Sequence, residues 1–336
     1  GLRRTGTGAH YLSNCFIGAL DSAVDYRLDV LAQNDTPIGN PITGSLQPYR
    51  MVRHLDVLNL AGAPAGDYSN VRVRFSETGS GSPPFVGFCT MQESVTFGAD
   101  FRIAKPADRA VPAVVVPVVA QTGSYSTEVH VRNHHAQDLT LGVGFHEADT
   151  SSVPGPRPCS PFVVPANTTA PLTLGSQCTL GAGSHFGMLV LENAAGSLGF
   201  TVFSRSQTPQ GVGFSVEGFP LAGFGAATVA VEGLKRTATG PKYLANCFVG
   251  ALGAALDYRL DLLTSDDVAL GAPLTGALQA NRLYRYLDVL AAAGAPAGDY
   301  AGVRAKFSRT AGSGSLLGFC TMQESITFSA DFRIGK

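Results

Sequence analysis

The sequence predicts an all-β protein made of three tandem antiparallel β-sandwich modules in the order A-B-A, of which the first and third are closely related copies. Three observations carry this prediction. Short segments throughout the 336 residues alternate between apolar and polar side chains, which is the pattern of half-buried strands. The 40 Gly and 20 Pro residues interrupt these segments at short intervals, and no long amphipathic helix pattern occurs. The third observation is a long internal duplication.

The duplication relates the beginning of the chain to its end. LSNCFIGAL at residues 12–20 returns as LANCFVGAL at residues 244–252, and GFCTMQES returns unchanged. The segment between the two copies shares only a faint pattern with them. We therefore predict module A at residues 1–105, module B at 106–221 and the second copy of module A at 222–336. With A-B as the repeat unit, the chain would hold about one and a half units. This favours a longer A-B-A-B array.

Individual strands follow from the alternation, taken in chain order. In residues 26–30 and 71–75 the apolar side chains occupy every second position, with Arg and Asp between them. In residues 97–103 the same rule places Phe97, Phe101 and Ile103 on the core face, and the charged residues between them in water. The stretch 56–64 has room for one helical turn. The later strands are expected in STEVHVRN (126–133), LTLGVGF (139–145), FGMLVLEN (186–193), GFTVFSR (199–205) and AATVAVEGLKR (226–236).

A loop that ends in tyrosine precedes the strand at residues 70–75. GAPAGDY at residues 62–68 recurs before the second copy of this strand, so that Tyr68 is repeated as Tyr300. This arrangement resembles an immunoglobulin-like or fibronectin-III-like sandwich, in which a corner tyrosine bonds back to the chain through its hydroxyl. The whole chain resembles the tandem immunoglobulin-like (Ig-like) modules of bacterial extracellular surface proteins. The resemblance implies Ig-like modules, a structural role for both tyrosines, and no catalytic residues.

The six cysteines fall two to each predicted module, and the spacing of the first pair is nearly repeated in the third module. Free buried thiols are the alternative, and zinc is disfavoured because no C-x-x-C motif occurs. The even count per module favours disulfides within modules. The expected pairs are Cys15 with Cys89, Cys159 with Cys178, and Cys247 with Cys320. Disulfides place the protein in an oxidising compartment, which we expect to be the periplasm, the cell surface or the medium.

The composition excludes several classes of protein. Only 15% of the residues are charged and the net charge is −1, which argues against a nucleic-acid binder. No run of about 18 apolar residues occurs, so we expect no transmembrane helix. Because the sequence opens with GLRRTGTG, we also expect no signal peptide here, and a mature or cut-out segment.

The histidines and aspartates that could bind a metal or perform catalysis are better explained by structural roles. The central module holds four histidines that could converge on a metal: His130, His134, His135 and His146. No H-E-x-x-H motif accompanies them, so solvated or capping roles are favoured. Five aspartates recur in both A copies: Asp25, Asp29, Asp56, Asp67 and Asp100. Ion pairs across strands or hydrogen bonds in turns explain them better than calcium binding or glycoside hydrolysis. No G-x-S-x-G occurs. We expect no enzyme, no metal and no cofactor.

Assembly is the function that remains. Residues 1–105, 106–232 and 233–336 carry net charges of 0, −4 and +3, so neighbouring modules do not repel one another. The first copy lacks a counterpart of AATVAVE, which would leave an open sheet edge able to accept a strand from another molecule. We expect contacts between modules at two apolar linkers, formed by Val114, Val116 and Val119 and by Phe219, Pro220, Leu221 and Phe224. The leading hypothesis is a self-assembling extracellular fibre, sheath or surface layer whose partners are copies of itself. The alternatives are a stalk that acts as a spacer, and an adhesin whose loops bind glycan or protein.

Overall fold

The computed structural model describes residues 2–6, 10–79, 83–94, 99–105, 110–149, 157–196, 198–209, 213–237, 242–324 and 330–335. Phe97, predicted to face a core, and the predicted module boundary at residue 106 lie outside these ranges. The described chain is all-β, as predicted, with several antiparallel sheets. Its helices are single turns, and none of them combines the length and apolar character needed to cross a bilayer.

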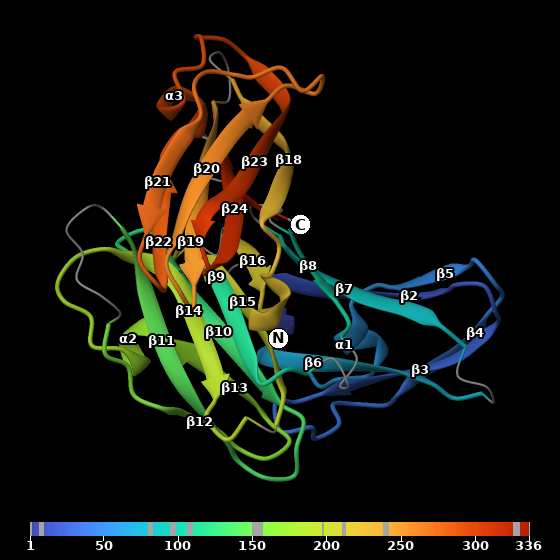
Figure 1. The fold of residues 1–336 in the computed structure, drawn as a ribbon. Helices are drawn as coiled ribbons and strands as arrows, with labels where there is room; N and C mark the ends of the chain where they lie inside the picture. Colours follow the sequence, from blue (N-terminus) through green and yellow to red (C-terminus); the bar gives the residue numbers. More distant parts are fainter. Residues whose placement is uncertain are drawn as a thin grey trace.

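The N-terminal segment (residues 2–105) forms two four-stranded sheets, drawn in blue and teal in Figure 1. One sheet has the order β1 (Leu2–Arg4), β6 (Tyr68–Glu77), β3 (Val24–Leu31), β4 (Ile42–Leu46). The other has the order β5 (Met51–His54), β2 (Tyr11–Ala19), β7 (Phe85–Glu93), β8 (Ala99–Ile103). Alternate residues of both sheets, such as Ile17 and Leu28, are fully buried in one common core. Two layers around a core are consistent with a β-sandwich.

The C-terminal segment (residues 228–335) repeats this arrangement. One sheet has the order β18 (Thr228–Arg236), β23 (Tyr300–Gly312), β20 (Leu256–Leu263), β21 (Leu274–Leu278). The other strands are β22 (Arg282–Tyr286), β19 (Tyr243–Leu252), β24 (Ser315–Glu324) and β25 (Ala330–Ile334). The predicted helical turn is present in both copies, as α1 (Val57–Leu60) and α3 (Val289–Ala292). The carboxylates of Asp56 and Asp288 accept backbone N–H groups at the start of these turns.

The central segment (residues 110–223) contributes the strands drawn in green and yellow in Figure 1. They are β9 (Ala113–Gln121), β10 (Ser126–Asn133), β11 (Leu139–Asp149), β12 (Phe162–Val164), β13 (Thr169–Thr173), β14 (His185–Asn193), β15 (Phe200–Gln207), β16 (Gly213–Glu217) and β17 (Phe219–Pro220), with the turns α2 (Leu174–Gln177) and η2 (Leu221–Gly223). Strand β11 pairs in parallel with β22, where Ala148 lies opposite Leu283. One 13-stranded sheet therefore runs from the central segment into the C-terminal segment.

The predicted phase of the strand at residues 99–103 is wrong. Phe101 and Ile103 are 58% and 45% exposed, whereas Asp100 is only 3% exposed. The reason is the neighbouring central segment, which supplies polar partners to the inward side of β8. Arg205 of β15 forms an ion pair with Asp100, and Arg102 donates to Ser215 Oγ at 2.9 Å. Once buried charges are paired in this way, the apolar side of the strand is the side left in water.

Asp29 is also buried, although the alternation of β3 predicts an exposed side chain. It is 6% exposed, and its carboxylate accepts hydrogen bonds from Arg27 at 2.8 Å and from Arg74 at 2.9 Å. These two guanidinium groups lower the pKa of the Asp29 carboxyl, against the effect of burial. Two long arginine side chains therefore cover a residue whose backbone position faces outward.

The predicted linker at residues 114–119 is wrong as well. Val114, Val116 and Val119 lie in β9 and are at most 2% exposed, within the core of the central segment. Val115 and Val118, which point the other way, lie in a second core shared with the C-terminal segment. A strand buried on both faces has apolar residues at every position, so its sequence resembles an apolar linker.

The predicted linker at residues 219–224 belongs to the same interior. Phe219 and Pro220 form β17, which pairs with β9 opposite Val115 and Val114. Leu221 and Phe224 pack, half-buried, against the second core. Residues 219–224 thus contact the C-terminal segment within the chain, whereas Val114, Val116 and Val119 lie in the core of the central segment. Contacts between molecules have to be sought elsewhere.

Candidate assembly interface

Three phenylalanines form a ladder on the outer face of the N-terminal sheet β5–β2–β7–β8. The rings of Phe16 and Phe88 stack with centroids 4.6 Å apart, and Phe88 and Phe101 are 4.9 Å apart. Phe16 and Phe88 are directly opposite in the register of β2 and β7, where cross-strand aromatic pairs stabilise a sheet. Apolar side chains flank the ladder and are 46%, 55% and 45% exposed: Leu20, Met51 and Ile103. We call these six residues the ladder face.

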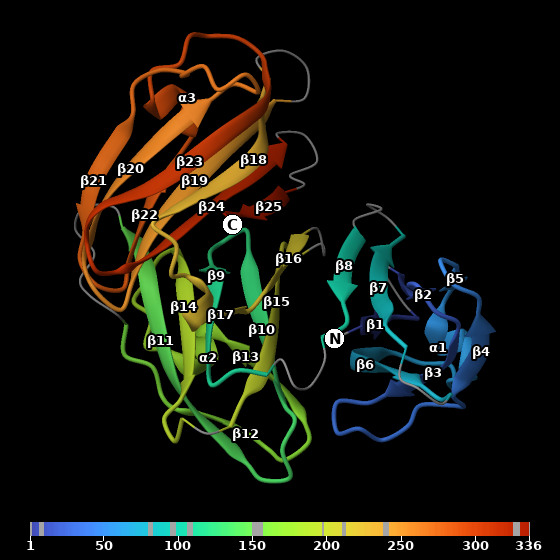
Figure 2. The same cartoon turned by 45° about the vertical axis from the view of Figure 1, so that its right-hand side comes forward.

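The C-terminal segment contains the same ladder, but there it is covered. Phe248 and Phe319 stack at 4.5 Å, and Phe319 and Phe332 are 5.4 Å apart. Phe186 of β14, from the central segment, extends the stack at 5.2 Å from Phe248. The exposure of Phe248 and Phe319 is 2% and 0%. Figure 2 shows the central strands beside the sheet that carries this second ladder. The second ladder therefore shows how such a face packs against side chains of another segment of the chain.

The N-terminal segment meets the central segment through charged groups instead. Besides the contacts of Asp100 and Arg102, the Lys105 ammonium lies 2.9 Å from Glu217. Asp35 accepts from both Arg72 and Arg132 at 2.5 Å. These contacts involve one edge of the sandwich and one loop, and they leave Phe101, Met51 and Ile103 of the ladder face exposed.

The sequence analysis missed the ladder because it looked for one apolar face per strand. A signal was available. Phe16 and Phe88 each adjoin a core cysteine, and both copies repeat this as Asn-Cys-Phe and Gly-Phe-Cys. Aromatic residues on the phase opposite to the core indicate a strand with apolar groups on both faces.

The structure forms three disulfides, in the pairing that the cysteine count favours: Cys15–Cys89, Cys159–Cys178 and Cys247–Cys320. Cys15 and Cys89 are directly opposite on neighbouring strands of one sheet, and the third pair repeats this. Antibody domains differ, because their disulfide joins the two sheets. Three disulfides indicate an oxidising compartment.

The two tyrosines after the GAPAGDY loops occupy equivalent places. The Tyr68 hydroxyl donates to the Pro64 carbonyl at 3.2 Å, and the Tyr300 hydroxyl donates to the Pro296 carbonyl at 2.9 Å. Arg4 and Arg236 lie over the two rings, at 4.7 and 4.9 Å from the ring centroids. Each tyrosine therefore holds its loop against the first strand of its own copy.

The central histidines point to separate partners. His130 stacks on Phe203 at 4.6 Å, and His134 Nε2 lies 3.0 Å from Thr201 Oγ1. His135 Nε2 contacts the Gly199 carbonyl at 2.8 Å, and His146 is buried elsewhere on β11. Nowhere in the described ranges do three His, Cys, Asp or Glu side chains lie close enough to hold a metal ion.

The aspartates shared by the two copies have local partners. Asp25 accepts from Ser45 Oγ at 2.5 Å, and Asp67 accepts from the Gly6 backbone at 2.6 Å. Asp56 caps α1, and the other two form the ion pairs given above. This set consists of turn, cap and salt-bridge residues spread over the first copy.

Acidification is expected to destabilise the protein through His146. Burial lowers the pKa of His146 to about 4, with a further contribution from the Arg282 guanidinium. The unfolded chain binds a proton near pH 6.5, before the folded chain does. Stability is therefore complete above pH 6.5 and falls by up to about 3 kcal/mol as the pH drops to 4. Melting temperatures between pH 7 and 4 should fall less steeply in His146→Gln than in the wild type or in a control, His10→Gln, whose side chain is exposed. Equal slopes in all three proteins would contradict this assignment.

Comparison of the chain with protein-family models, with curated proteins and with solved structures finds no match.

Proposed function

We propose that the protein is a non-enzymatic structural subunit that assembles with copies of itself into an extracellular fibre, sheath or surface layer. In this proposal the chain is a tandem array of three Ig-like sandwich modules in A-B-A order, secreted or held at the cell surface. The ladder face carries the proposal. A contiguous aromatic and aliphatic patch on a folded surface is a feature of interaction sites.

The two copies support a packing role for this face. The two copies have nearly the same sequence and present the same stacked rings, and one copy buries them against side chains of the central segment. The apolar face of the central segment is already occupied by the C-terminal copy. Among the described residues, the apolar sheet face that is still exposed is the ladder face. In solution, its available partner is therefore the ladder face of a second molecule. With a net charge of −1 and little surface charge, two such molecules meet without strong repulsion.

Self-association of the full chain should therefore depend on the ladder face. We expect concentration-dependent association in sedimentation velocity, weakened by about tenfold or more in the double variant Phe101→Ser, Met51→Ser. Both side chains are more than half exposed, so the variant should fold normally. Val268→Ser, at a residue 61% exposed in the C-terminal segment, is the matched control and should associate like the wild type. A wild-type chain that remains a monomer over a wide concentration range would leave the spacer hypothesis in place of assembly.

A further inference from the structure

Strand β4 forms an open edge of the N-terminal sheet. It pairs with β3 on one side, from Leu46 opposite Val24 to Ile42 opposite Leu28. On its other side no strand of the described residues pairs with it, and the backbone of residues 42–46 forms no further backbone hydrogen bond within the described ranges. Such an edge presents a row of N–H and C=O groups that a strand of another molecule can use.

The equivalent strand β21 is open in the same way, at the end of the sheet β18–β23–β20–β21. The central segment follows the first copy in the chain and precedes the second, and it contacts both of them. In neither position does it reach this edge in the described part of the chain. The open edge is therefore a property of the repeat itself, on whichever side of a copy the central segment lies.

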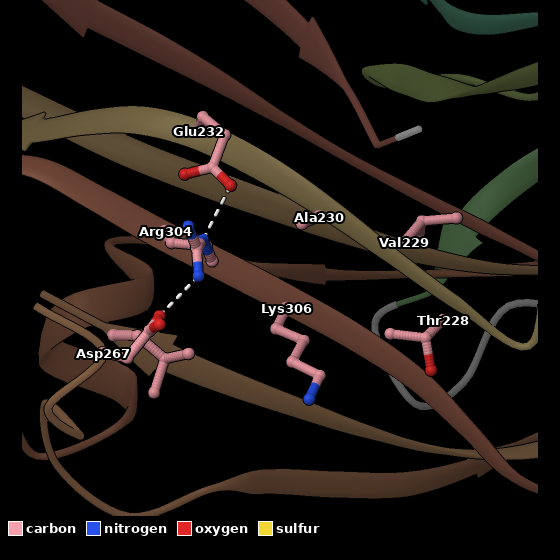
Figure 3. A pocket seen from close by; sticks show the side chains of 8 residues that line it. Thr228, Val229, Ala230, Glu232, Asp267, Arg304 and Lys306 are labelled. Carbon is pink, nitrogen blue, oxygen red and sulfur yellow. Dashed lines mark hydrogen bonds and ion pairs between the residues drawn. The ribbon is translucent and has the colours of Figure 1, made fainter. Parts of the chain in front are cut away.

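This edge lacks the charged side chains that protect many natural edge strands from pairing. The opposite edge of the C-terminal sheet has them. Figure 3 shows Glu232 of β18 and Asp267 on either side of Arg304, whose Nε donates to Glu232 Oε1 at 2.6 Å. By contrast, residues 40–48 (NPITGSLQP) and 272–280 (APLTGALQA) contain no charged residue. Nothing on β4 or β21 therefore repels a second strand electrostatically.

Strand β4 is also complementary to a second copy of itself. Its sequence, Ile-Thr-Gly-Ser-Leu, has the order apolar, hydroxyl, glycine, hydroxyl, apolar in both directions. When two β4 strands lie antiparallel with Gly44 opposite Gly44, Ile42 meets Leu46 of the second molecule, and Thr43 meets Ser45. Thr43 and Ser45 are exposed, whereas Ile42 and Leu46 are half-buried on the core side. A two-fold axis at Gly44 therefore places hydroxyls opposite hydroxyls and aliphatic groups opposite aliphatic groups.

Three differences favour β4 over β21 for this pairing. Leu278 of β21 is 6% exposed, whereas the equivalent Leu46 is half-buried and gains burial from a second strand. Ala277 replaces Ser45, which removes one hydroxyl from each cross-strand pair. Strand β4 also lies on the side of the N-terminal segment that faces away from the central segment, where a second molecule can approach (Figures 1 and 2).

We propose that β4 pairs antiparallel with β4 of a second molecule about a two-fold axis at Gly44, which joins the two sheets into one. Main-chain hydrogen bonds supply the affinity, and the pairs of Thr43 with Ser45 fix the register. The inference rests on the proposed function in one respect, because the partner is another copy of the chain. The ladder face belongs to the other sheet of the sandwich, so the two contacts together link molecules into a row with alternating joints.

An exchange of charges tests both the pairing and its register. The parent is the full chain with Phe101→Ser and Met51→Ser, in which the ladder face is disabled, and its dimerisation is measured by sedimentation velocity. Thr43→Lys with Ser45→Lys should weaken the dimer by about tenfold or more, because lysines then face each other across the axis. Thr43→Glu with Ser45→Glu should have the same effect. An equimolar mixture of the two variants should dimerise again, because each lysine is then opposite a glutamate.

The matched control is Thr275→Lys with Ala277→Lys, at the equivalent exposed positions of β21. It should dimerise like the parent, and melting temperatures verify that all variants are folded. A mixture that remains monomeric, or a β21 control that loses dimerisation as well, would overturn the proposal. Failure of the ladder face appears separately, as equal association of the wild type and the parent.

Discussion

Replacing Cys15 and Cys89 together by alanine is expected to lower the free energy of unfolding of the N-terminal segment by about 4 kcal/mol. The disulfide closes a loop between residues 74 positions apart, and its removal returns that conformational freedom to the unfolded chain. The side chains are at most 4% exposed and lie in the core between the sheets. Peptide-resolved hydrogen exchange in the full chain measures the loss segment by segment, because unfolding of several units need not be two-state.

The other two disulfides provide the comparison. Cys247→Ala with Cys320→Ala opens a loop of nearly the same length, 73 positions, and should cost the C-terminal segment a similar amount. Cys159→Ala with Cys178→Ala opens a loop of 19 positions and should cost about 3 kcal/mol. A larger loss for the short loop than for the long loops would show that local packing, rather than chain entropy, dominates.

Asp100→Ala is expected to lower the free energy of unfolding by about 3–5 kcal/mol and to loosen the N-terminal segment from the central segment. Asp100 is 3% exposed and forms ion pairs with Arg205 and, at 3.7 Å, with Arg102. Burial already lowers the pKa of Arg102 to about 10. Removing the carboxylate leaves two guanidinium groups in a poorly solvated place without their shared counter-charge.

The second copy supplies a matched control for this substitution. Asp331 occupies the same position in β25, but its side chain is 53% exposed and pairs with Arg333 at 3.0 Å. An exposed ion pair contributes little, so Asp331→Ala should change the free energy of unfolding by less than about 1 kcal/mol. Denaturant unfolding of both variants, with hydrogen exchange at β8 and β25, makes the comparison. Small and equal effects would mean that water reaches Asp100.

Much of the local structure could be predicted from residue patterns. Alternation in residues 26–30 predicts β3, because a strand between a core and water needs an apolar side chain at every second position. The stretch 56–64 predicts the turn α1, and the cysteine count favours the disulfides that form. These features depend on neighbours in sequence, or on a partner within the same predicted module.

Contacts between segments were not predictable in this way. The residues of β9 read as a linker because both of their faces are covered, one by the central core and one by the C-terminal segment. The pairing of β11 with β22, which joins two segments in one sheet, has no local signature either. Both depend on surfaces that meet only after the individual strands have formed.

The duplicated copies separate most clearly what the local sequence determines from what the packing of the segments determines. The sequence that the copies share determines what both copies have in common: Phe88 and Phe319 stack on the ring beside them, and Asp100 and Asp331 follow on the next strand. Only the tertiary structure decides that Phe319 is buried and Phe88 is not, and that Asp100 is buried while Asp331 faces water. The physical reason is that a strand presents two faces with the same periodicity, and burial of the outer face depends on which segment packs against it.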